Sequence, residues 1–143
     1  MTADKKHIVI DARIRRASTG RPVQRFLEHL PDLDTANHYT ILVEHSDDYV
    51  SPAKNINVLR SSSPRFSMNP WHQIAFTWQL YKLKPDLVFF TMTGFAPLFY
   101  FGQNITFTHD LTMLRFVRQG KHSLLLHKIR MLGYRILFFT GNF

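Results

Sequence analysis

Short runs of β-branched and aromatic residues alternate along the chain with stretches in which apolar residues recur every three or four positions. The runs predict buried strands, and the spaced stretches predict helices that pack one face against a sheet. This alternation predicts an α/β fold, a Rossmann-like, mainly parallel sheet with helices on both faces. The predicted strands are His7–Asp11, Tyr39–Val43, Asn57–Leu59, Leu87–Phe90 and the run that begins at Ile105.

The first predicted helix is Val23–Leu30, whose apolar residues fall at helical spacing. Gly20 and Pro22 mark its start, because glycine adopts backbone conformations closed to other residues and proline suits a first helical turn. Pro31 is expected to end it. The loop before it carries Arg13, Arg15 and Arg16 and is either a tight connection, which we favour, or a place where backbone amides meet an anion. Most arginines in such loops lie in solvent.

The second predicted helix, Trp71–Leu83, follows a segment rich in serine and proline, Arg60–Pro70. That segment is either an ordinary surface connection or a mobile loop over a cleft. Trp71 and Trp78 fall on the apolar face of the helix, and we expect this face to pack on the sheet.

The segment Ser123–Phe139 is a third helical candidate, and two interpretations of it stay open. Lys121, Lys128 and Arg135 recur every seventh position and therefore lie close to one face of a helix. In the interpretation that we favour, the helix packs on the sheet with this basic stripe in water. In the other, it lies in the plane of a membrane surface with the stripe at the headgroups. Its charges count against a bilayer-spanning helix.

Composition bounds the class of protein. The 143 residues are 45% hydrophobic and 14% aromatic, which suffices for one core and predicts a single domain over residues 1–143. The chain has no cysteine, so disulfides and thiolate zinc sites are excluded. The polar start of the chain lacks the apolar core of a secretory signal, and we expect a cytoplasmic protein.

The net charge of +8 implies attraction to an anionic partner, such as a phospholipid surface, a phosphorylated substrate or nucleic acid. Nucleic acid is the least favoured of these, because the chain shows no recognisable binding motif and its basic residues are spread out. The histidines show no spacing typical of a zinc site, so neither a metal nor another cofactor is predicted.

The candidate chemistry lies where strands end. Ile105–Leu111 reads ITFTHDL, and as a strand it would carry His109 and Asp110 to the sheet edge at which open α/β folds bind ligands. Thr91, Thr93 and Gly94 follow the preceding strand and are expected in the same cleft. By itself, a histidine at such a place more often bonds a neighbouring backbone than takes part in catalysis.

Four short sequence motifs occur along the chain in an order that indicates a family. They are IVIDAR near the N-terminus, STGR opening a helix that ends in FLEHL, PDLVFF, and TFTHDL followed by Arg115 and Phe116. Together they resemble the N-terminal half of family 4 glycosyltransferases of the GT-B fold, and the resemblance spans most of the chain. It implies a Rossmann-like domain that holds the acceptor and faces a second domain that binds the nucleotide-sugar donor.

The resemblance also implies roles for individual residues. His109 matches the histidine near the donor sugar and Asp110 follows it, while Gly20 and Arg21 match the first loop, close to the donor diphosphate. A leaving diphosphate gathers negative charge, which loop amides and cations would stabilise, and a histidine can shift protonation near neutral pH. The loop departs from the family pattern, because Gly20 is followed directly by Arg21 and Pro22, and one glycine and a tyrosine are missing.

The function implied is that of a retaining glycosyltransferase, which moves a sugar from a nucleotide-sugar donor to a cell-envelope glycan or lipid-linked acceptor. The expected place is the cytoplasm or the inner face of the membrane. The resemblance does not reach the donor-binding half, so we expect this chain alone not to catalyse transfer without that C-terminal domain or a separate partner chain. The alternative is a non-catalytic basic α/β module that binds anionic membrane or nucleic acid.

Overall fold

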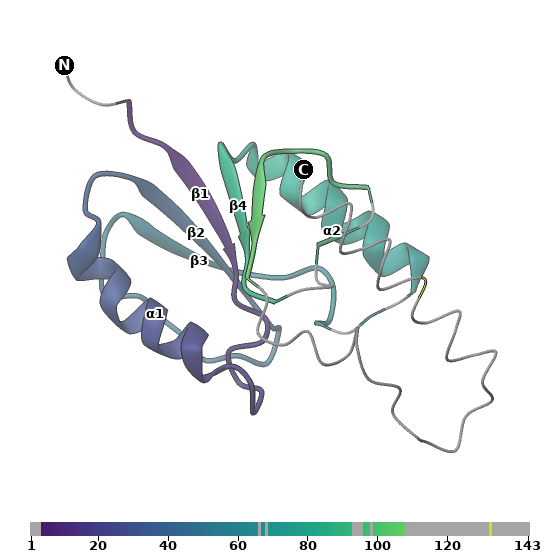
Figure 1. The fold of residues 1–143 in the computed structure, drawn as a ribbon, viewed down its shortest axis with the longest axis horizontal. Coiled ribbons are helices and arrows are strands. Elements are labelled where there is room, and N and C mark those ends of the chain that lie inside the picture. Colours follow the sequence, from purple (N-terminus) through teal and green to yellow (C-terminus); the bar gives the residue numbers. More distant parts are fainter. Residues whose placement is uncertain are drawn as a thin grey trace.

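The computed structural model describes residues 4–65, 67, 69–92, 96–97, 99–107 and 132. Within them, strands and helices follow the alternating order that the sequence predicts, and the sheet lies between the helices (Figure 1). In chain order the elements are β1 (His7–Asp11), α1 (Arg21–Leu33), β2 (His38–Val43), β3 (Ile56–Arg60), α2 (Pro70–Leu83), β4 (Leu87–Phe90) and β5 (Asn104–Thr106).

The five strands form one sheet in the order β3-β2-β1-β4-β5, and every pairing is parallel. β1 lies in the centre, where Ile10 is paired with Ile41 of β2 on one side and Phe89 of β4 on the other. The chain proceeds from β1 outward to β3 and then returns to β4 on the other side of β1. The strand order therefore reverses between β1 and β4, which is the switch point at which open α/β sheets bind ligands.

Successive residues of the central strands point to opposite faces of the sheet and build two separate cores. On one face, Val23, Leu27 and Leu30 of α1 pack against a cluster that includes Ile10 and Ile41. On the other face, Phe76 and Leu80 of α2 pack against the strand residues that point the opposite way. The buried residues of this second cluster are Val9, Leu42, Phe76, Leu80, Val88, Phe90 and Tyr100. The prediction of helices on both faces is confirmed.

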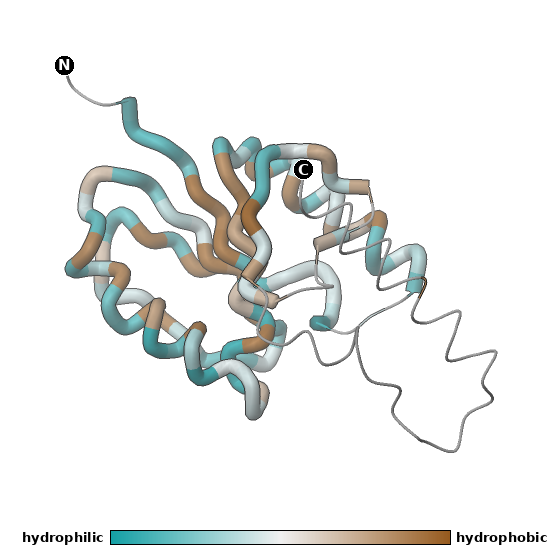
Figure 2. Tube along the Cα trace, viewed as in Figure 1, coloured by the Kyte–Doolittle hydropathy of each residue, from teal (hydrophilic) through white to brown (hydrophobic). Residues whose placement is uncertain are grey.

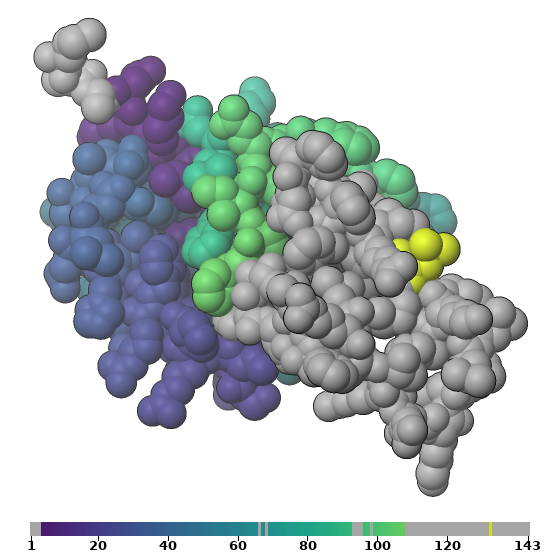
Figure 3. Space-filling model, viewed as in Figure 1, coloured from purple at the N-terminus to yellow at the C-terminus, as the bar shows by residue number. Residues whose placement is uncertain are grey.

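The hydropathy of the trace follows this layering. Apolar residues concentrate in the central strands and on the side of α1 that faces them (Figure 2). In the space-filling view, the purple, blue and green atoms of β1, α1, β2, β4 and β5 form one continuous block (Figure 3).

Helix α1 is longer than predicted, and the expectation that Pro31 ends it was wrong. The helix continues to Leu33, and the backbone N–H of Asp34 donates to the carbonyl of Leu30 at 3.2 Å. Proline lacks the N–H that would bond the carbonyl four residues earlier. Pro31 lies in the last turn, so it costs the helix one terminal bond and leaves the rest of the ladder intact.

Helix α2 was predicted with the wrong face toward the sheet. Its buried residues are Phe76, Thr77 and Leu80, whereas Trp71 is 76% exposed and Trp78 is 61% exposed. The helix carries apolar side chains on two opposite faces, so helical spacing alone did not decide which of them is covered. The end of the helix at Leu83 agrees with the prediction.

Strand β5 contains the start of the run predicted from Ile105, but the strand begins one residue earlier, at Asn104. It pairs with β4, and the N–H of Phe107 donates to the carbonyl of Phe90 at 2.8 Å. The rest of that run, from Thr108 onward, and the helical candidate Ser123–Phe139 apart from Leu132 lie outside the described residues. Within the residues that are described, no helix combines the length and the apolar character needed to cross a bilayer.

Candidate functional site

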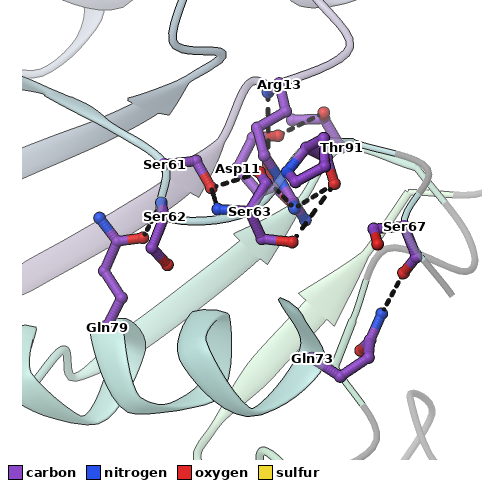
Figure 4. Close-up of polar contacts among 10 residues, drawn as sticks. Asp11, Arg13, Ser61, Ser62, Ser63, Ser67, Gln73, Gln79 and Thr91 are labelled. Atoms are coloured by element: carbon purple, nitrogen blue, oxygen red, sulfur yellow. Dashed lines mark hydrogen bonds and ion pairs between the residues drawn. The ribbon is translucent and has the colours of Figure 1, made fainter. Parts of the chain in front are cut away.

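The carboxyl ends of three strands meet in a buried polar cluster at the switch point (Figure 4). Asp11 ends β1, and Thr91 follows β4. The Thr91 hydroxyl donates to the Asp11 carbonyl oxygen at 2.6 Å, and both residues are buried. Ser61 and Ser63 arrive from the end of β3 and are buried as well.

Asp11 and Arg13 form a buried ion pair in this cluster. Nε of Arg13 donates to Oδ1 of Asp11 at 2.8 Å, and Nη2 donates to Oδ2 at 2.7 Å. Asp11 is 0% exposed and Arg13 is 3% exposed. The ring centroid of Phe76 lies 3.7 Å from Cζ of Arg13, so α2 packs directly on the guanidinium. This bidentate pair of hydrogen bonds compensates both charges in a buried place from which water is excluded.

The same arginine ties down the segment between β3 and α2. Nη1 of Arg13 donates to the carbonyls of Ser63 at 3.3 Å and Pro64 at 3.4 Å. The Ser61 hydroxyl donates to the Ser63 carbonyl at 2.9 Å, and the N–H of Ser62 donates to Oε1 of Gln79 at 2.8 Å (Figure 4). The described part of this segment is thus an anchored connection, which favours the first of the two interpretations of Arg60–Pro70.

Gly20 stands directly before α1, as predicted, but for a different physical reason. Its φ of −82° is open to any residue. A Cβ at this position would overlap the carbonyl oxygens of Ile14 and Arg15. Two turns bring these groups together, with bonds from Ala17 N to Ile14 O at 2.8 Å and from Gly20 N to Ala17 O at 2.9 Å. The loop needs glycine for close backbone packing.

The arginines of this loop differ in burial and in pairing with aspartates. The expectation that they lie in solvent was wrong for Arg13 and Arg15. Arg15 is paired with Asp47, and it also donates to Asp48 at 2.9 Å. The hydrogen bond to Asp47 raises the pKa of Arg15. Burial acts to raise the pKa of Asp47, but the hydrogen bonds from Arg15 and the Tyr49 N–H outweigh it and leave that pKa lowered.

Arg16 and Arg21 are exposed, and within the described part of the chain no ion pair neutralises either of them. Arg16 donates to the carbonyl of Ser46 at 3.0 Å. Arg21 is the first residue of α1, whose cap residue Gly20 supplies no side-chain bond. Positive charge at this sheet edge is therefore available at the start of α1 and at Arg16.

Three of the site residues predicted from sequence are described. Gly20 and Arg21 open α1, and Thr91 lies against the end of β1, from which the loop to Gly20 departs. The other predicted positions lie outside the described residues: Thr93, Gly94, His109, Asp110, Lys121, Lys128 and Arg135.

The sequence interpretation missed the pairing of Asp11 with Arg13. An aspartate that ends a buried strand, followed two residues later by an arginine, was the available signal. No three histidine, aspartate or glutamate side chains in the described ranges converge in a way that could hold a metal ion.

The chain was also compared with known proteins. It matches no protein-family model, and neither a curated protein nor a solved structure shows significant similarity to it. The fold and the polar edge at the switch point, together with the order of the sequence motifs, are therefore the basis for a functional proposal.

Proposed function

We propose that this chain is the acceptor-side domain of a retaining glycosyltransferase of the GT-B type. In this proposal it serves transfer from a nucleotide-sugar donor to a cell-envelope glycan or lipid-linked acceptor. The observation that carries the proposal is the reversal of strand order between β1 and β4, in an all-parallel sheet whose motifs follow the family's order. Ligands of open α/β sheets bind at the carboxyl edge beside such a reversal.

The start of α1 supports a role toward the donor diphosphate. Gly20 lets the loop carbonyls approach closely and leads straight into the helix, whose first amides carry partial positive charge. Arg21 adds an exposed cation at the same place. Arg13 and Arg15 are already neutralised by aspartates, so Arg21 is the better candidate to stabilise a leaving diphosphate.

The buried cluster has a supporting role in this proposal. The ion pair of Asp11 with Arg13, and the bond from Thr91, hold the ends of β1, β4 and the segment after β3 in one arrangement. Reacting groups next to this buried cluster would be held in a fixed position, which catalysis requires. His109 and Asp110 are the groups proposed to act there, with the histidine beside the transferred sugar.

Amide chemical shifts of the ¹⁵N-labelled chain test the proposal. The chain is titrated with glycans, with lipid-linked sugars and with nucleotide sugars. We expect saturable shifts at the carboxyl edge, in residues 12–21 and around Thr91. Arg21→Gln should weaken the response to nucleotide sugars, whereas Arg25→Gln should not, because Arg25 lies further along α1 in an exposed pair with Glu28. Both variants remove one charge from the same helix.

Two results would overturn the proposal. One is the absence of edge shifts with every sugar and acceptor. The other is steep, salt-dependent binding to generic duplex or RNA, which marks a nucleic-acid module.

A further inference from the structure

Helix α2 presents a row of apolar side chains to solvent. Trp71, Ile74, Trp78 and Tyr81 are all exposed, and their spacing of three and four residues places them on one face of the helix. The opposite face buries Phe76 and Leu80 against the sheet. We call these four exposed residues the aromatic row.

The aromatic row continues onto the segment before β5. The N–H of Phe101 donates to the Tyr81 hydroxyl oxygen at 3.0 Å, and that hydroxyl donates to the Phe99 carbonyl at 3.4 Å. Phe99 and Phe101 are themselves exposed, Phe101 by 83%. Single exposed apolar residues are ordinary, but a contiguous patch marks a surface that binds something.

The charges carried by α2 and by its C-terminal cap are positive. Nζ of Lys82 lies 4.1 Å from the centroid of the Trp78 ring, and Lys84 follows as the exposed cap of the helix. The helix itself contains no aspartate or glutamate. Together with the net charge of +8, these lysines make the surface complementary to an anionic partner.

We propose that the aromatic row docks α2 on an anionic lipid surface. Tryptophan and tyrosine have an apolar ring with one polar tip and favour the boundary between headgroups and acyl chains. In this arrangement Ile74 and the rings enter that boundary, and Lys82 and Lys84 meet lipid phosphates. A lipid surface accepts a convex row without a matching pocket. The proposal does not rest on the glycosyltransferase function, because docking requires no sugar chemistry.

The two tryptophans of the chain, Trp71 and Trp78, both lie in the aromatic row, so selectively excited tryptophan fluorescence reports on this face alone. We expect vesicles of phosphatidylcholine mixed with phosphatidylglycerol to shift the emission to shorter wavelength and to protect it from acrylamide. Phosphatidylcholine brominated along its chains, mixed with phosphatidylglycerol, should quench it. Vesicles of phosphatidylcholine alone should have a much smaller effect, since they offer the lysines no net negative charge.

Flotation of variants separates the contributions. Replacing both tryptophans, Trp71→Ser with Trp78→Ser, should weaken binding to the anionic vesicles by about a hundredfold, or about tenfold for each buried ring. Lys82→Gln with Lys84→Gln should weaken it by about tenfold or more and flatten its salt dependence. The matched control, Leu33→Ser with Val50→Ser, also removes two largely exposed apolar side chains but should leave binding unchanged.

Other occupants of the aromatic row would give different results. Protection of the tryptophan fluorescence from acrylamide without vesicles would overturn the proposal. If this protection increased with protein concentration together with the fraction of dimer, the occupant would be a second copy of the chain. Displacement of vesicles by generic duplex, with the same fluorescence change, would assign the row to nucleic acid. Undiminished flotation of the tryptophan variant, with a native far-ultraviolet spectrum, would equally overturn it. None of these outcomes bears on sugar binding at the carboxyl edge.

Discussion

The pair of Asp11 with Arg13 is the residue-scale feature on which the carboxyl edge depends. Arg13 is buried, and its Nε and Nη2 groups both donate to the Asp11 carboxylate. Asp11→Ala should therefore remove the carboxylate that binds this buried guanidinium through two hydrogen bonds, and lower the free energy of unfolding by about 3–5 kcal/mol. Urea denaturation measures this change.

A second variant separates the lost pair from lost packing. Asp11→Leu combined with Arg13→Met removes both charges and keeps much of the apolar volume over Phe76, so it should recover a large part of the loss. A double variant no more stable than Asp11→Ala would contradict the importance of pairing.

Asp47 gives a pH dependence whose sign follows from its pKa. The folded protein lowers that pKa, since the bonds from Arg15 and the Tyr49 N–H outweigh burial, which acts to raise it. The resulting stabilisation is present above the unfolded value of about 3.9 and is lost as the pH falls through the lower folded value. Urea midpoints measured from neutral to acid pH should fall less steeply for Asp47→Asn. Asp48→Asn removes one carboxylate from an exposed neighbour on the same arginine and serves as the matched control.

At the scale of elements, α2 allows a direct test of which of its faces carries stability. Leu80 is fully buried, and Leu80→Ala should cost about 2–5 kcal/mol of unfolding free energy. Trp78 is mostly exposed, and Trp78→Ala should cost well under that despite the larger side chain removed. Thermal or urea unfolding of both variants checks the order. The reverse order would mean that the aromatic row is part of the core.

The strands could be predicted from the sequence, whereas the covered face of α2 could not. The strands were predictable because β1, β2 and β4 are short apolar runs buried on both faces, and β1 and β4 begin and end at the predicted residues. The covered face of α2 was not, because apolar side chains line both sides of it. The bond from Arg13 to the Ser63 carbonyl could not be predicted either, since Ser63 lies fifty residues further along the chain.

At the scale of the whole molecule, the strand order predicts how stability is distributed. Among the strands that the structure describes, β1, β2 and β4 each have a strand on both sides, whereas β3 and β5 are the edges. Amides of the inner strands should therefore exchange with solvent only on global unfolding, and those of the edges by smaller local openings. Hydrogen exchange followed by NMR should find Ile10, Ile41 and Val88 slowest, with faster exchange at Asn57 and Ile105. Equal protection at Ile105 would show that β5 is covered along its outer edge and would end the assignment of β5 as an edge strand. Anionic vesicles should leave the order within the sheet unchanged, because the aromatic row lies on the face of α2 opposite its contact with the strands.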